Sequence, residues 1–106
     1  MLRHNTLCRK IEYLIINNFI LFMDKVYVLT IRDISDGTLL TNEVHVFKNL
    51  NNAKKVLNDK IKEYLNNNNF ENYEIKQTDI SFHAWEKENS IYEHITIDIV
   101  ECKIND

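Results

Sequence analysis

The sequence predicts a small α+β domain with the order β-β-α-β-β, in which a four-stranded, mainly antiparallel sheet carries one amphipathic helix on one face. Three observations support this fold class. Two β-rich segments flank an Asp-Gly turn, a central segment has helical periodicity, and two further alternating segments follow it. The 106 residues suffice for one hydrophobic core and are too few for two domains.

The first hairpin is predicted around Asp36-Gly37. Residues 25–33 are rich in β-branched and aromatic side chains, and the return strand covers residues 39–48. A two-residue Asp-Gly loop is typical of tight hairpins. Such a loop would place Leu29 opposite Val44.

The central helix is predicted over residues 51–66, where apolar residues recur at spacings of three and four. Asn49 or Asn51 can cap its start. Residues 66–69, all Asn, can end it in the left-handed conformation. The face expected to turn toward the sheet is apolar and consists of Ala53, Val56, Leu57, Ile61, Tyr64 and Leu65.

The second hairpin is predicted from two alternating strands, residues 73–86 and 91–103, with a polar connection between them. A symmetric turn around Glu88 and Asn89 divides their side chains between two faces. The strand order stays open between a split β-α-β arrangement and one with the first and last strands adjacent, as in β-grasp folds. The face expected to form the core is apolar and consists of Ile80, Phe82, Ala84, Ile95, Ile97 and Ile99.

Residues 1–22 are interpreted as an N-terminal extension of a single domain formed by residues 23–106. Met23 directly precedes the first predicted strand, so translation can begin there or at Met1. The apolar run in the extension contains polar residues and is shorter than the roughly 20 residues that span a bilayer, so we expect no signal peptide and no membrane association. The extension is expected to form an extra strand or a helix whose apolar stripe is Leu7, Ile11, Leu14, Ile15 and Phe22.

The two cysteines, Cys8 and Cys102, are too few and too far apart in the sequence for a disulfide framework or a four-thiolate zinc site. We therefore expect reduced thiols in a cytoplasmic protein, located in the host cytoplasm if a phage encodes it. Cys102 lies in the last predicted strand, where a thiol acts as a small apolar group.

The charge balance limits the class of partner. The chain has 13 basic and 16 acidic side chains, and residues 23–106 alone have 10 and 15. Binding to free nucleic acid needs a basic surface, so we expect none. A negatively charged domain favours a protein partner with a basic surface, which can be the nucleic-acid channel of an enzyme.

The outer face of the second predicted hairpin gathers aromatic, imidazole and carboxylate side chains. Symmetric pairing places them two by two: Trp85 beside Tyr92, His83 beside His94, and Asp79 beside Asp98. Trp and Tyr are enriched at the energetic centres of protein interfaces. We therefore interpret these residues as a partner-binding surface. The N-terminal extension or a second copy, forming a homodimer, are alternative occupants of this face.

The two histidines raise metal binding and catalysis as alternatives. Imidazole and carboxylate groups are zinc ligands, but Asp79 and Asp98 would lie about 13 Å along their strands from His83 and His94. General acid–base chemistry favours an enclosed site, and the sequence has no nucleophile motif or glycine-rich loop that predicts one. We therefore expect no metal, no cofactor and no enzymatic activity.

In type, the chain resembles the small, acidic, single-domain proteins of phages and mobile elements, of which the anti-CRISPR proteins are the best-known group. The resemblance rests on size, negative charge and the β-β-α-β-β pattern around Tyr27-Val28-Leu29, Val56-Leu57 and Ile95-Thr96-Ile97. It implies a stoichiometric inhibitor that binds a Cas effector or its guide-bound complex. The alternatives are a self-associating structural or accessory protein of a phage or mobile element, and a histidine-based accessory enzyme linked to a metal or to nucleic acid.

Overall fold

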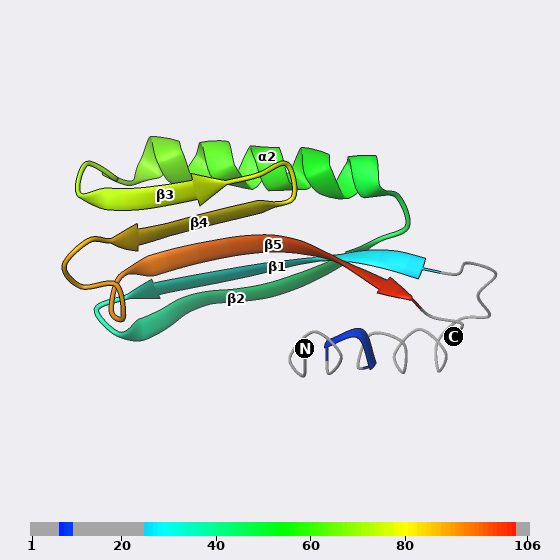
Figure 1. Ribbon diagram of the computed structural model, residues 1–106, viewed down its shortest axis with the longest axis horizontal. Helices are drawn as coiled ribbons and strands as arrows, with labels where there is room; N and C mark the ends of the chain where they lie inside the picture. Colours follow the sequence, from blue (N-terminus) through cyan, green and yellow to red (C-terminus); the bar gives the residue numbers. More distant parts are fainter. Residues whose placement is uncertain (1–6, 10–24, 104–106) are drawn as a thin grey trace.

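The computed structural model describes residues 7–9 and 25–103, and it places one helix on one face of a five-stranded sheet (Figure 1). In chain order the elements are β1 (Lys25–Ser35), β2 (Thr38–Phe47), α2 (Leu50–Asn67), β3 (Tyr73–Gln77), β4 (Ser81–Glu86) and β5 (His94–Lys103). The sheet order is β2-β1-β5-β4-β3, and all neighbouring strands are antiparallel. The predicted α+β class is confirmed, and the first and last strands are adjacent.

The sheet has five strands instead of the predicted four because residues 73–86 form a hairpin, β3 and β4, in place of one strand. The turn begins at Thr78, whose backbone N–H donates to the carbonyl of Ser81 at 2.9 Å. The Thr78 hydroxyl also accepts a bond from the N–H of Ile80 at 3.2 Å, which stabilises the turn without Gly or Pro. Ile80, predicted to belong to the core, lies in this turn and is 42% exposed.

The β1–β2 hairpin turns at Asp36 and Gly37, as the sequence predicts. Both residues have positive φ, 51° for Asp36 and 73° for Gly37. Tight two-residue hairpin turns of this kind need positive φ at both central positions, which Asp and Gly tolerate better than most residues.

A bulge changes the register of this hairpin beyond the turn. The register shifts between Asp33 and Ile34, so that Leu29 lies opposite His45 and not opposite Val44 as predicted. A shift of one residue exchanges the two faces of a strand. Val44 therefore lies on the sheet face away from α2, where it is 48% exposed.

Helix α2 begins as predicted and ends differently. The Asn49 side chain accepts from the backbone N–H of Asn51 at 2.7 Å and of Asn52 at 3.4 Å, which confirms an asparagine cap. At the other end, Asn68 is extended, with φ of −133°, so the predicted left-handed ending is wrong. Its backbone N–H and its side-chain amide both donate to the carbonyl of Tyr64, so the side chain supplies a terminal bond without left-handed backbone.

The main core lies between α2 and the sheet, as predicted. Phe70 packs edge-to-face against Tyr73 and Phe82 at one end of it. Leu65, predicted to face the sheet, is 43% exposed. The buried residues of this cluster come from the helix and three strands and are Leu29, Ile31, Ala53, Leu57, Ile61, Phe82, Ala84, Ile95, Ile97 and Ile99.

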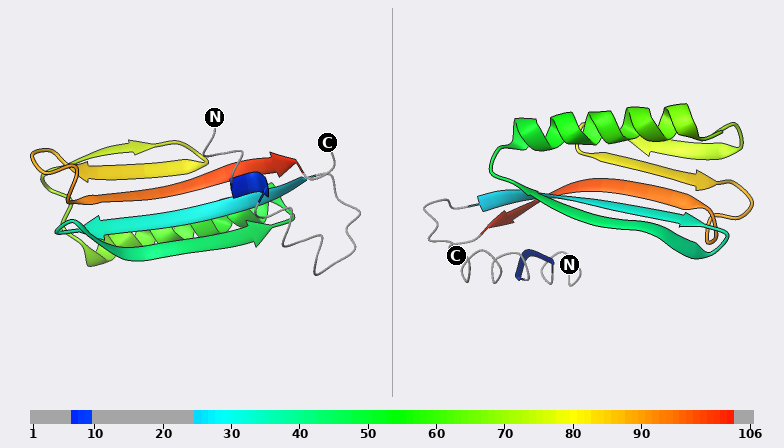
Figure 2. Two further views of the ribbon diagram at one scale, coloured as in Figure 1. Left: turned by 90° about the horizontal axis from the view of Figure 1, so that it is seen from below. Right: turned by 180° about the vertical axis from the view of Figure 1, so that it is seen from behind.

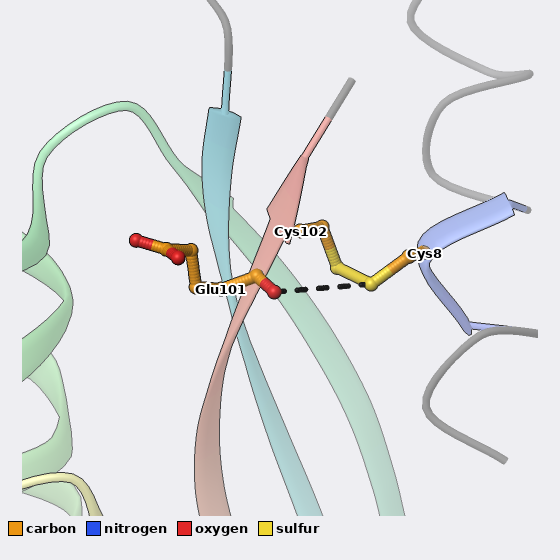
Figure 3. Close-up of a disulfide and its surroundings, with 3 residues drawn as sticks. All are labelled: Cys8, Glu101 and Cys102. Carbon is orange, nitrogen blue, oxygen red and sulfur yellow. Dashed lines mark hydrogen bonds between the residues drawn. A yellow bond between two sulfur atoms is a disulfide. The ribbon is translucent and has the colours of Figure 1, made fainter. Parts of the chain in front are cut away.

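A second apolar cluster lies on the opposite face of the sheet, where a disulfide joins Cys8 to Cys102 (Figure 3). Val26, Val28 and Cys102 are buried there and pack against Leu7 and Cys8. Residues 7–9 lie across the sheet from α2 (Figure 2). The prediction of two reduced thiols is wrong because the fold brings together cysteines that are 94 residues apart in the sequence.

The predicted N-terminal extension is described only at residues 7–9, which are helical. Leu7 packs on the second apolar cluster, as a residue of an apolar stripe would. The other members of the predicted stripe, Ile11, Leu14, Ile15 and Phe22, lie outside the described residues. Within the described ranges, no helix is long and apolar enough to cross a bilayer.

The main core makes a first testable prediction. Leu57→Ala should lower the free energy of unfolding by about 3 kcal/mol, because Leu57 is fully buried and its truncation leaves a cavity. Leu65→Ala, on the same helix but exposed, should cost less than about 1 kcal/mol. Denaturant unfolding measures both values. Equal losses for the two variants would contradict this orientation of α2.

The disulfide makes a second prediction. Cys8→Ser should lower the free energy of unfolding by about 2 to 4 kcal/mol, because the bond restricts the unfolded chain over a long loop. Thiol titration of the denatured, unreduced wild type should find no free thiol. A dithiol reductant should destabilise the wild type and leave Cys8→Ser unchanged. Two titratable thiols in the unreduced wild type would show that the bond does not form.

Candidate functional site

The candidate site lies on the sheet face that α2 does not cover, which is toward the viewer in Figure 2 (left). Alternation along β4 and β5 brings His83, Trp85, His94, Thr96 and Asp98 to this face, and we call these five residues the imidazole face. Phe82 and Ala84, the alternate residues of β4, point into the core on the other side. The predicted division of side chains between the two faces is therefore confirmed for these strands.

The predicted pairing across β4 and β5 is wrong by two residues. Trp85 lies opposite His94, and His83 lies opposite Thr96. The cause is a connection over residues 87–93 that is longer than a symmetric two-residue turn. A shift by an even number of residues keeps each side chain on its face and changes its neighbour across the strands.

Tyr92 lies in this connection and not beside Trp85. Its carbonyl accepts a bond from the backbone N–H of Gly37 at 3.0 Å, which joins the β4–β5 loop to the β1–β2 turn. The Tyr92 ring lies so close to Gly37 that a Cβ there would be 2.9 Å from Tyr92 Cδ1. The Tyr92 side chain is 56% exposed.

Asp79, also predicted for the binding surface, lies at the opposite end of the sheet in the β3–β4 turn. Its carboxylate is 3.0 Å from the ammonium group of Lys54 on α2. The hydrogen bond from Lys54 lowers the pKa of Asp79 below its ordinary value, and the lysine charge adds to the effect. Asp79 therefore joins the turn to the helix and takes no part in the imidazole face.

Each histidine of the imidazole face has one ring nitrogen in a hydrogen bond with an oxygen that can only accept. His83 Nε2 lies 2.8 Å from Asp98 Oδ1, a contact made possible by the shifted register. His94 Nδ1 lies 2.8 Å from the carbonyl oxygen of Ser90. Each of these nitrogens therefore carries a hydrogen and donates it.

The two histidines line one shallow hollow with Trp85. Its volume is about 340 Å³, and its walls also include Thr96 and Ser90. Lys76 on β3 places its ammonium group 5.8 Å from the centroid of the Trp85 ring. The hollow thus offers an aromatic surface and imidazole groups to a ligand or partner.

Glu93 joins three loops at the end of the sheet beside the imidazole face. Its carboxylate accepts from the backbone N–H of Asp36 at 2.7 Å, from the hydroxyl of Ser35 at 3.3 Å and from the hydroxyl of Tyr73 at 3.2 Å. The Asp36 N–H lowers the pKa of Glu93 below its ordinary value. Sequence reasoning missed this residue because its partners lie 20 or more residues away in the chain.

The same end of the molecule is acidic. Partial burial raises the pKa of Asp33, and the nearby negative charge of Glu93 raises it further. The α2–β3, β1–β2 and β4–β5 connections meet there (Figure 1). We call this region the acidic end. Its strand ends and loops carry the basic residue Lys87 and the acidic residues Asp33, Asp36, Glu71, Glu86, Glu88 and Glu93.

The His83–Asp98 pair lies at an open surface. The side chains of His83 and Asp98 are 43% and 36% exposed, whereas general acid–base groups usually act in an enclosed site. The hydroxyl of Ser81, the nearest candidate nucleophile on β4, is hydrogen-bonded to Thr78 at 2.8 Å. Within the described residues, no group of three or more His, Cys, Asp or Glu side chains is placed to hold a metal ion.

Comparisons of the chain with protein-family models, with curated proteins and with solved structures found no match. The functional argument below therefore rests on the geometry and charge of the imidazole face and the acidic end.

The Glu93 contacts make a pH-dependent prediction. Glu93→Gln should lower the free energy of unfolding at neutral pH by about 1 kcal/mol, because a neutral amide accepts weaker hydrogen bonds than a carboxylate. The pKa of Glu93 is lowered in the folded protein, so its contribution is present above the unfolded-state pKa and is lost as pH falls through the folded pKa. The difference between wild type and variant should therefore disappear in acid, below the ordinary glutamate value of 4.5.

Urea unfolding at a series of pH values measures this difference. Glu88→Gln, in the same loop, is the matched control and should change stability little at any pH. A Glu93→Gln effect that persists unchanged in strong acid would show that the carboxylate charge is not its cause.

Proposed function

We propose that this chain is a noncatalytic protein-binding domain that contacts its partner through the imidazole face. The observation that carries the proposal is Trp85, an aromatic side chain in an open hollow on the sheet face that α2 leaves uncovered. Tryptophan is prominent among residues that dominate binding energy, and hydrogen-bonding groups such as those of His83 and Thr96 can form the rim around it.

The partner we propose has a basic surface. The acidic end adjoins the hollow, and Tyr92 is exposed beside it. A concentration of negative charge beside an apolar contact speeds encounter with a positively charged protein and disfavours free nucleic acid. Tyr92 and the acidic end would then contact the same partner as Trp85.

The narrower form of the proposal is an inhibitor that binds a CRISPR–Cas effector or its guide-bound complex. Such effectors hold nucleic acid in a positively charged channel, which presents a surface of the required sign. The small size of the chain and its net charge of −3 are consistent with this role. This role would place the chain in the cytoplasm of a host cell, where the Cys8–Cys102 disulfide would have to persist in a reducing environment.

Self-association is the second candidate, and β2 is the observation that favours it. This ten-residue strand lies at the edge of the sheet, where its outer backbone groups can pair with a strand of another molecule. Val44 and Val46 on this strand are 48% and 45% exposed. A homodimer through β2 would cover them and leave the imidazole face open.

The test of the binding proposal compares Trp85→Ala with Leu65→Ala as bait. Bound proteins and RNA are identified by mass spectrometry and sequencing after capture from lysate of the native host, and each captured protein is then purified and titrated. We expect one nuclease complex that binds wild type and Leu65→Ala equally. Its affinity for Trp85→Ala should fall by at least about fivefold, which corresponds to about 1 kcal/mol.

Circular dichroism must show that Trp85→Ala remains folded. A purified partner that binds Trp85→Ala and wild type equally well would refute the role of the imidazole face. Recovery of the chain alone, together with a dimer that Val44→Lys dissociates, would favour self-association through β2.

A further inference from the structure

The hydrogen bonds of the two histidines determine which ring nitrogens are available to a ligand. A neutral imidazole has one N–H donor and one nitrogen with a free lone pair. Because His83 donates from Nε2 to Asp98, its lone pair is on Nδ1. Because His94 donates from Nδ1 to the carbonyl of Ser90, its lone pair is on Nε2.

The two donor bonds lie on opposite sides of the histidine pair. Along β5, Asp98 comes four residues after His94, whereas Ser90 comes four residues before it, and His83 lies opposite Thr96 between them. The two nitrogens of an imidazole point in divergent directions, so the lone pair of each ring points away from its hydrogen-bond partner. Both rings line the same hollow.

The strand positions of the two histidines allow them to share an ion. His83 and His94 occupy diagonal positions across an antiparallel pair, where Cα atoms are about 7–8 Å apart and long or aromatic side chains can meet. Imidazole nitrogens bind zinc at about 2.0–2.1 Å. Both residues line the same open hollow, which leaves room for water or a further ligand on the solvent side.

We propose that Nδ1 of His83 and Nε2 of His94 together bind one divalent transition-metal ion, of the class of Zn²⁺, Ni²⁺ or Cu²⁺. Imidazole is a good ligand for these ions. Metal-binding histidines usually donate their other N–H to a carboxylate or a backbone carbonyl, and Asp98 and Ser90 provide one of each. Asp98 positions His83 and is not itself a ligand. Solvent completes the coordination.

This site goes beyond the proposed protein binding and does not depend on it. With two ligands from the chain, the ion keeps open positions that face solvent. The direct contact between His83 and Asp98 distinguishes the arrangement from the sequence-based expectation, in which the carboxylates lay too far away to take any part.

Isothermal titration of the full-length, untagged, unreduced chain with ZnCl₂ and with NiCl₂ tests the proposal. The disulfide keeps Cys8 and Cys102 from competing for the ion. We expect one ion per chain, at least tenfold weaker binding in His83→Gln and in His94→Gln, and binding within twofold of wild type in His45→Gln. His45 is the matched control because it lies on β2, bonded to Glu43 and away from the hollow. Asp98→Asn, which weakens the support of His83, should reduce affinity about tenfold.

A second measurement keeps the test decisive if a variant loses its fold. In the wild type, zinc should shift the ¹⁵N resonances of His83 Nδ1 and His94 Nε2 and leave those of His45 unchanged. Absence of saturable binding, or binding that both single variants retain at wild-type strength, would overturn the site. Loss of partner capture in Trp85→Ala with zinc binding retained would separate the two proposals.

Discussion

The pairing of β1 with β5 is the interaction on which the rest of the structure depends. These strands pair from Lys25↔Lys103 to Ile34↔His94, so they join the two ends of the described domain along the centre of the sheet. Their alternate side chains supply both apolar clusters. Leu29 and Ile99 face α2, while Val28 contributes to the cluster on the other side. On the face away from α2, this pair is buried near Val28 and Cys102 and more exposed toward His94, where β5 and β4 carry the candidate site.

Position along β5 divides the open face into two regions with different chemistry. Near Cys102 the face is apolar, and Leu7 and Cys8 cover it through packing and a disulfide. Toward His94 the side chains are polar or aromatic, and they border the shallow hollow. The Cys8 Sγ atom also lies 4.0 Å from the carbonyl of Glu101 (Figure 3). The part of the face that Leu7 and Cys8 cover is therefore the C-terminal part of β5. The candidate site thus lies at the part of β5 where the side chains form hydrogen bonds, as His94 and Asp98 do, and not at the part where they are buried, as Cys102 is.

The sequence predicts the elements that depend on local interactions and misses those that depend on distant ones. The Asn49 cap, the Asp36-Gly37 turn and the alternation around Ile97 involve neighbours in the chain, and all three are confirmed. The Thr78 turn escapes prediction because a side-chain hydroxyl replaces the usual Gly or Pro signal. The Cys8–Cys102 bond escapes it because the two cysteines are 94 residues apart in the chain and meet only in the folded domain.

The candidate site shows that the sheet face on which a side chain lies is easier to predict from sequence than the neighbours it contacts there. Alternation with a period of two assigns His83, Trp85 and His94 to one face, and a register shift of two residues does not disturb that assignment. The chemical properties of a side chain depend, however, on the groups that it contacts. The same shift replaces a predicted His83–His94 contact with the His83–Asp98 hydrogen bond. The length of the 87–93 connection therefore decides which groups the histidines donate to, and through that which nitrogens remain to accept. A polar loop with no motif of its own thus determines the chemistry of the strands that it joins.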